Sequence, residues 1–206
     1  EYMAGEKIVL FADWRFIIQE KEEKYIPNHK GFDLFYNDYI AEYFKYKYIP
    51  YFRKLYSQIH PSITSYVEQF ALPQNAIGVH IRSWYCDRQK YHNDKLFIDA
   101  INKYPINTPI FLCADNCDVI KRFRQIYNTR IITTKLVKQN TILIETARQP
   151  NDWDSHANAL IEMLILARCN TIIGTYLSTY TECAWWFGGC KAHVVIPLPY
   201  AIKEYD

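Results

Sequence analysis

Two polar turns that follow apolar strands carry the residue types that could bind and activate a phosphorylated ligand. A strand over 76–81 contains His80 and leads into Arg82, and a strand over 171–174 leads into the hydroxyl-rich segment 175–179. His80 and Arg82 are two positions apart, so both side chains point to the same face of a strand. In an open α/β sheet, phosphorylated ligands bind beyond the carboxyl ends of the strands. We therefore expect the two turns to line one ligand site.

Arg82 is the candidate for the reacting centre. Its planar guanidinium could make two charge-assisted hydrogen bonds to a diphosphate. It could also stabilise the negative charge that grows on a leaving phosphate, with no proton transfer required. A structural arginine paired with a nearby carboxylate explains the same residue, and both interpretations stay open.

The second turn offers hydroxyl groups and the start of a helix. Ser178 or Thr179 would cap a helix over 178–187, and the free N–H groups of that helix, with hydroxyls from Thr175 onward, would form an anion site. An ordinary helix N-cap explains the same residues. The expectation that this turn and Arg82 share one edge of the sheet favours the anion site.

Acidic and amide side chains follow on neighbouring elements. Asp115 ends a strand over 109–114, where it could bind a base or ribose, or cap a helix over 117–127. Asp154, Asn158 and Glu162 lie on one face near the start of a helix over 156–168. Asp154 or Ser155 could cap that helix, and the same face could contact a nucleobase or an acceptor.

The elements that must position these residues alternate regularly in the second part of the chain. We expect strands over 76–81, 109–114, 130–134, 171–174 and 193–196, and helices over 93–103, 117–127, 156–168 and 178–187. Strands that alternate with helices of this length are typical of βαβ units. The pattern predicts an α/β, Rossmann-type doubly wound parallel sheet.

The first part of the chain predicts a smaller or truncated α/β segment. A strand over 7–12, a loop over 18–32 and an ambiguous, aromatic-rich stretch over 33–48 come first. A helical pattern then runs over 50–70. Within it, Ile63, Val67 and Phe70 follow helical spacing after a start at Pro61. A linker at 72–75 separates an expected acceptor-side segment, 1–73, from a donor-binding domain, 74–206. The residues at the chain start read as a helix end, which predicts further residues upstream.

Composition excludes several function classes. The net charge of +2 leaves no basic footprint for nucleic acid. The apolar runs are too short to span a bilayer, and neither the histidines nor the six cysteines show metal-ligand spacing. Because the chain has no Asn-x-Ser/Thr sequon and its cysteines are typical of reduced thiols, we expect a cytoplasmic location. No metal and no bound cofactor are expected.

Four ordered segments resemble motifs of a known family. They are Gly78-Val79-His80-Ile81-Arg82 and the stretches 110–115, 158–169 and 173–180, and the stretch 13–15 adds a further similarity. Together they resemble the α1,2-, α1,6- and protein O-fucosyltransferase superfamily, which uses GDP-fucose. The resemblance covers most of residues 6–15 and 76–190.

The resemblance implies a two-domain GT-B-type fold and inverting, metal-independent transfer of fucose to a glycan or other hydroxyl acceptor. It implies that Arg82 holds the β-phosphate and stabilises its departure, and that His80 contacts the nucleotide or fucose. Asp115 would lie near the nucleotide. Ser178 and Thr179 would hold the diphosphate.

Two features depart from the family pattern. Family members often place an acidic residue three positions after the arginine, where this chain has Tyr85, and their glycine-rich first turn is absent from the sequence. Asp87 and Glu162 are the candidates for the acceptor base. A non-catalytic nucleotide-sugar or glycan-binding module, and a Rossmann-like enzyme for another nucleotide, are the alternatives.

Overall fold

The computed structural model describes residues 39–82, 93–134, 153–175 and 178–197, with side chains from Tyr48 onward in the first range and from Ala157 onward in the third. The expected strand at 7–12, the loop at 18–32 and Asp87 lie outside these residues.

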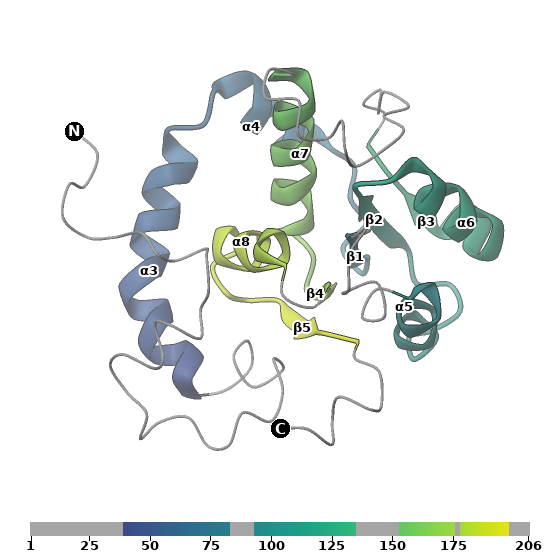
Figure 1. The fold of residues 1–206 in the computed structure, drawn as a ribbon. Coiled ribbons are helices and arrows are strands. Elements are labelled where there is room, and N and C mark those ends of the chain that lie inside the picture. Colours follow the sequence, from purple (N-terminus) through teal and green to yellow (C-terminus); the bar gives the residue numbers. More distant parts are fainter. Residues whose placement is uncertain (1–38, 83–92, 135–152, 176–177, 198–206) are drawn as a thin grey trace.

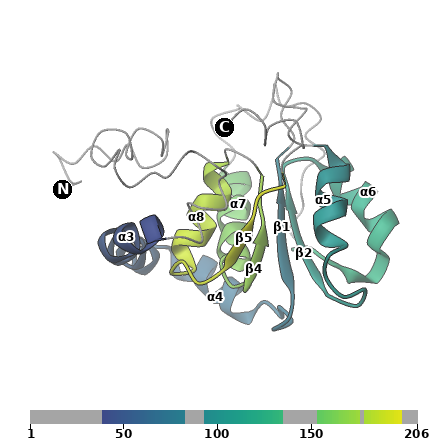
Figure 2. The ribbon, with the colours of Figure 1, turned by 90° about the horizontal axis from the view of Figure 1, so that it is seen from below.

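A five-stranded parallel sheet forms the centre of the molecule (Figures 1 and 2). Its strands are β1 (Ile77–Ile81), β2 (Ile110–Ala114), β3 (Ile131–Ile132), β4 (Thr171–Ile173) and β5 (His193–Val195), and their spatial order is β3-β2-β1-β4-β5. This is the Rossmann-type order, in which the chain builds outward from β1 and then crosses back to its other side. The predicted α/β class and doubly wound sheet are confirmed.

The strand order creates a topological switch point between β1 and β4. These neighbours are paired in parallel, with Val79 opposite Ile173, and β1 also pairs with β2. Every residue of β1 and β2 is buried, as a parallel sheet covered on both faces requires. The carboxyl ends of β1 and β4 therefore meet at the sheet edge where such folds bind ligands.

Helices cover both faces of the sheet (Figure 2). Helices α5 (Asp94–Ile101) and α6 (Cys117–Tyr127) pack on one face, while α7 (Trp153–Leu166) and α8 (Thr179–Phe187) pack on the other. The alternation of β1 puts Ile77, Val79 and Ile81 toward α5 and α6. His80 takes the opposite face, toward α8.

The expected helices are confirmed, with one correction. Helix α6 has the predicted bounds, and α8 begins one residue later than expected. Helix α7 already includes Trp153, so the prediction that Asp154 or Ser155 caps it is wrong, and both residues lie in its first turn. An acidic residue is also favourable inside the first turn, where it faces the positive end of the helix dipole, so its presence alone did not mark the boundary.

Two further helices precede the sheet. Helix α3 (Tyr39–Ser57) covers part of the ambiguous aromatic stretch and runs through Pro50, and α4 (Pro61–Gln69) begins at the expected proline. The backbone carbonyls of Val67 and Phe70 accept hydrogen bonds from Arg168, which follows α7. A short 3₁₀ helix, η4 (Asn128–Arg130), leads into β3.

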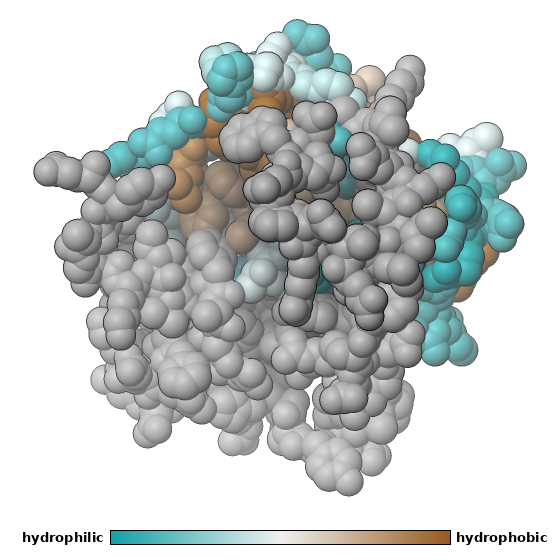
Figure 3. Space-filling model, turned by 45° about the horizontal axis from the view of Figure 1, so that its top comes forward, coloured by the Kyte–Doolittle hydropathy of each residue, from teal (hydrophilic) through white to brown (hydrophobic). Residues whose placement is uncertain are grey.

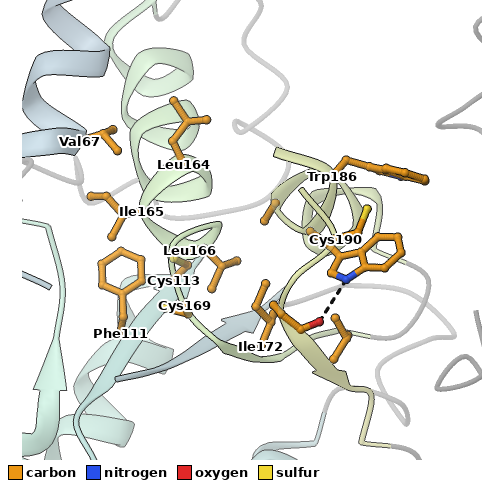
Figure 4. Close-up of a cluster of buried hydrophobic side chains, with 14 of the residues drawn as sticks. Val67, Phe111, Cys113, Leu164, Ile165, Leu166, Cys169, Ile172, Trp186 and Cys190 are labelled. Atoms are coloured by element: carbon orange, nitrogen blue, oxygen red, sulfur yellow. Dashed lines mark hydrogen bonds between the residues drawn. The ribbon is translucent and has the colours of Figure 1, made fainter. Parts of the chain in front are cut away.

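The larger hydrophobic cluster lies under α7 and α8 (Figure 4). Phe111 and Ile172 from the sheet meet Ile165 and Leu166 from α7, and Trp185 of α8 is fully buried. Its indole N–H donates to the carbonyl of Ala192 at 3.2 Å, so burial leaves no unpaired polar atom on the ring. Each such side chain contributes roughly 1.5–3 kcal/mol through burial, which holds α8 firmly over the sheet.

The molecular surface differs between the two sides. Figure 3 shows hydrophobic residues on the side of α3 and α4, whereas hydrophilic residues predominate on the side of α6. No helix in the described ranges is both long enough and apolar enough to cross a membrane.

Candidate functional site at the carboxyl edge of the sheet

Thr175 joins the two turns that the sequence singled out. Its Oγ1 donates to the carbonyl of His80 at 2.7 Å and accepts from the backbone N–H of Arg82 at 3.0 Å. One buried hydroxyl therefore clamps the end of β1 to the end of β4. The structure brings His80, Arg82 and Thr175 together at the switch point, and the exposed Arg82 follows the last strand residue there.

His80 is held by two residues of α8. Its imidazole is 4% exposed and stacks on the ring of Tyr180, with centroids 4.5 Å apart and planes inclined by 24°. Its Nδ1 lies 2.8 Å from the Oγ1 of Thr181. The same Oγ1 accepts the backbone N–H of Thr175 at 3.3 Å. A single network therefore connects β1, the turn after β4 and the first turn of α8.

Gly174 allows α8 to begin this close to β4. A Cβ atom at position 174 would lie 2.3 Å from Cγ2 and 2.9 Å from Oγ1 of Thr181. Contacts that short do not occur in real side chains, so only glycine fits between the strand end and the helix. The glycine thereby fixes where the first turn of α8 sits relative to His80.

The start of α8 matches the predicted anion site in position. Ser178 takes the N-cap position with φ −97° and ψ 111°, but its hydroxyl makes no capping hydrogen bond. The residue is buried, and its own N–H donates to the carbonyl of Thr175 at 3.2 Å. Thr179, the first helical residue, is exposed. The cap explanation therefore accounts for the place of Ser178 and leaves its hydroxyl without a capping role.

Two roles were proposed for Asp115 at the end of β2, a contact to a base or ribose and the cap of the next helix, and the structure gives the cap to Asn116. The side chain of Asn116 caps α6, accepting the N–H of Asp118 at 2.8 Å. This overturns the alternative in which Asp115 caps that helix. Asp115 is exposed directly after β2, next to the carboxyl end of β1. Sequence reasoning missed Asn116, although asparagine is as good a cap as aspartate.

Glu162 lies at the β2–β3 side of the same edge. Its carboxyl is 5% exposed, and Oε1 accepts a hydrogen bond from the hydroxyl of Thr134 at 2.7 Å, just beyond β3. Its backbone carbonyl faces the thiol of Cys113 at 3.7 Å. Asn158, one turn earlier on α7, is half-buried. The sequence could not reveal the role of Thr134, because Glu162, its hydrogen-bond partner, is 28 residues away.

Burial raises the pKa of two side chains in α8, Glu182 and Tyr180. It raises the pKa of Glu182 to about 7, and a hydrogen bond from the Trp186 indole N–H at 3.4 Å lowers it only in part. Burial, together with nearby Cys113 and Glu162, raises the pKa of Tyr180 well above its usual range. Tyr180 therefore stays protonated and donates to the carbonyl of Ala159 at 2.7 Å, tying α8 to α7.

No group of three or more His, Cys, Asp or Glu side chains that could hold a metal ion occurs within the ranges that the structure covers. The five cysteines described there are reduced thiols: Cys113, Cys117, Cys169, Cys183 and Cys190.

Comparison with known proteins gives partial structural likeness only. No family model matches the chain, and no curated protein sequence matches it. A structure of the NodZ alpha-1,6-fucosyltransferase soaked with GDP-fucose is 23% identical with a TM-score of 0.43, over 62% of this chain and 42% of that one. The same enzyme crystallised with GDP is 26% identical with a TM-score of 0.40, over 62% and 40%. Fucosyltransferase NodZ from Bradyrhizobium is 25% identical with a TM-score of 0.41, over 61% and 41%. The chain therefore spans less than half the length of these enzymes.

Proposed function

We propose that this chain forms the donor-binding part of a GDP-sugar glycosyltransferase of GT-B type, which transfers L-fucose from GDP-fucose to a glycan or other hydroxyl acceptor. The observation that carries the proposal is the Thr175 clamp. It gathers Arg82, His80 and the start of α8 at the switch point of a Rossmann-type sheet. A phosphate bound there meets a guanidinium, free helix N–H groups and hydroxyls together.

The order of the family-like motifs supports this choice. The His-x-Arg motif begins in β1 and extends one residue beyond it, Asp115 follows β2, and the hydroxyl-rich motif leads from β4 into α8. All three therefore reach the same sheet edge, although they are far apart in sequence.

In the proposed reaction the acceptor oxygen attacks the anomeric carbon while the bond from that carbon to the β-phosphate oxygen breaks. GDP leaves with the bonding electron pair, and Arg82 stabilises the negative charge that develops on the phosphate. The acceptor hydroxyl releases its proton to water as the new glycosidic bond forms. The donor is a substrate, and the proposal assigns no metal and no bound cofactor to the step.

Glu162 fits a nucleotide contact better than the role of acceptor base. Its bond to Thr134 holds it at the end of β3, two strands from the β1 end that bears Arg82. Adjacent strands lie about 4.8 Å apart, so the carboxylate is displaced from Arg82 toward β3. We place on that side the nucleoside of a ligand whose diphosphate meets Arg82. Guanine offers N–H donors that a carboxylate accepts. Asp87, the other base candidate, lies outside the described residues.

The test is calorimetric titration of the chain with GDP, GDP-fucose, GDP-mannose and UDP. We expect saturable binding of GDP and GDP-fucose that is lost in Arg82→Ala. The matched control is Arg122→Ala, because Arg122 pairs with Asp94 away from the site. In a transfer assay, Arg82→Ala should lose at least 10²–10³-fold in rate, the typical loss for removing one such charge contact. Failure of every GDP compound to bind, or equal binding of UDP, would overturn the proposed donor.

The second candidate is a non-catalytic GDP-sugar-binding module. Tyr85 stands where family members often carry an acid, and this favours binding without transfer. Such a module would bind GDP-fucose with the same dependence on Arg82, yet transfer no sugar to any acceptor in a broad panel.

A further inference from the structure

We propose that Thr181 is a positioning residue that sets the tautomer and orientation of His80. The inference rests on the proposed donor site, because it concerns how His80 meets a ligand there. Thr181 is fully buried in the first turn of α8, and its hydroxyl is the point at which three elements meet.

Hydrogen-bond accounting fixes the direction of each bond. The backbone N–H of Thr175 can only donate, so the Thr181 hydroxyl accepts it at 3.3 Å. The hydroxyl proton then needs an acceptor, because buried polar groups are almost always paired. Within the described ranges, the Nδ1 of His80 at 2.8 Å is the acceptor that the structure offers it. The hydroxyl therefore donates to Nδ1.

This direction determines the chemistry of the ring. A neutral imidazole that accepts at Nδ1 carries its proton at Nε2. Tyr180 stacks on the ring face and limits its rotation, so the ring plane is set as well. His80 is thereby held as an Nε2–H donor, the form suited to a phosphate or sugar oxygen. Its Nε2 is then a donor and its Nδ1 is already occupied by the Thr181 hydroxyl, which argues against His80 as the base that deprotonates the acceptor hydroxyl.

The surrounding backbone protects this arrangement. Gly174 leaves room for Thr181, whose Cγ2 and Oγ1 occupy the space of a Cβ atom there. Thr175 ties the same turn to the backbone of His80 at 2.7 Å. Movement of the Thr181 hydroxyl away from Nδ1 would therefore also break its hydrogen bond to the N–H of Thr175.

The first readout needs no ligand. Imidazole ¹⁵N spectra of the wild-type chain, with the His80 signals assigned by their loss in His80→Phe, should show a protonated Nε2 and an unprotonated Nδ1 at neutral pH. Thr181→Val keeps the shape of the side chain but removes the hydroxyl, and should give a mixture of tautomers. Thr181→Ser should restore the wild-type pattern. A protonated Nδ1 in the neutral wild-type ring would overturn the inference.

The second readout is kinetic. Thr181→Val should lower kcat about 10–100-fold, the range seen when the group that orients a metal-bound imidazole is removed. Thr181→Ser should recover most of that loss. Thr108→Val is the matched control, because Thr108 is buried before the amino end of β2, and it should keep wild-type kcat. Equal kcat losses in Thr181→Val and Thr181→Ser would contradict the hydroxyl's role. If wild type binds no GDP compound, the proposed function fails, and the tautomer pattern still decides the role of Thr181.

Discussion

At the residue scale, adjacent side chains after β2 have separable tasks. Asn116 satisfies a backbone N–H of α6, whereas Asp115 faces the edge where the nucleotide is proposed to bind. We expect Asp115→Ala to weaken GDP binding with little change in unfolding free energy. Asn116→Ala should cost about 1 kcal/mol of stability, the usual value of a lost N-cap, and should affect binding less. Urea unfolding and calorimetry on both variants check this. A larger stability loss in Asp115→Ala than in Asn116→Ala would contradict the division.

The candidate site residues that could be predicted from the sequence are those marked by a pattern in their neighbouring residues. His80 and Arg82 are two positions apart at the end of a predicted strand. Thr175 belongs to a run of hydroxyl-bearing residues before a predicted helix. Thr181 and Thr134 had no such signal, because each acquires its role from a partner far along the chain. His80 and Thr181 are 101 residues apart. Sequence spacing predicts which residues share an edge, but it does not predict which atoms meet there.

At the element scale, prediction succeeded where periodicity and boundary residues agree. Helix α6 has apolar residues on one stripe and an asparagine before its first residue, and its bounds were predicted correctly. The start of α3 at Tyr39 was missed, because Pro50 usually ends or kinks a helix. Tertiary packing explains why the helix continues through Pro50, since Phe52 stacks on Trp186 of α8 with ring centroids 5.7 Å apart. Such contacts stabilise a helix that local propensity alone would not favour.

The contact between β1 and α7 depends on one missing side chain. A Cβ at Gly78 would lie 2.4 Å from Cδ1 of Leu166 and 3.0 Å from Sγ of Cys169. We expect Gly78→Ala to lower the free energy of unfolding by about 1–3 kcal/mol through overpacking. In a double-mutant cycle with Leu166→Ala, the double variant should lose less free energy of unfolding than the two single variants together, because Leu166→Ala removes the clash with Leu166. Urea unfolding measures all four species, and strictly additive losses would rule out this contact as the cause.

At the scale of the whole molecule, the early helices share a core with the domain that we propose to bind the donor. Phe52 of α3 and Val67 of α4 belong to the same buried cluster as Leu164 and Trp186. Arg168 adds hydrogen bonds to the carbonyl of Val67 in α4 and, at 3.1 Å, to that of Phe70, which follows the helix. The proposed division at residue 73 therefore concerns which ligand each part serves, since α3 and α4 pack as part of one hydrophobic layer over α7 and α8.

The buried carboxyl of Glu182 makes the stability of this hydrophobic layer depend on pH. Its pKa is about 7 in the folded chain against a usual 4.5, because burial beside Trp186 disfavours the charged form. Between these values the folded state keeps a proton that the unfolded state releases, so stability is highest below about pH 4.5 for this group and falls as pH rises through 7. The difference corresponds to roughly 3 kcal/mol at most.

Glu182→Gln should remove that dependence, because the amide keeps the neutral shape of the protonated acid. In urea unfolding from pH 4.5 to 8.5, the variant should match wild type at the acid end and exceed its stability at the alkaline end. The exposed Glu68→Gln on α4 is the control and should follow the wild-type curve. The buried acid matters to the whole molecule because α8 carries both Glu182 and the Thr181–His80 bond. Loss of α8 packing at alkaline pH should therefore reduce GDP binding in wild type before it does so in Glu182→Gln. Parallel stability curves for the two proteins would show that Glu182 does not titrate in this range.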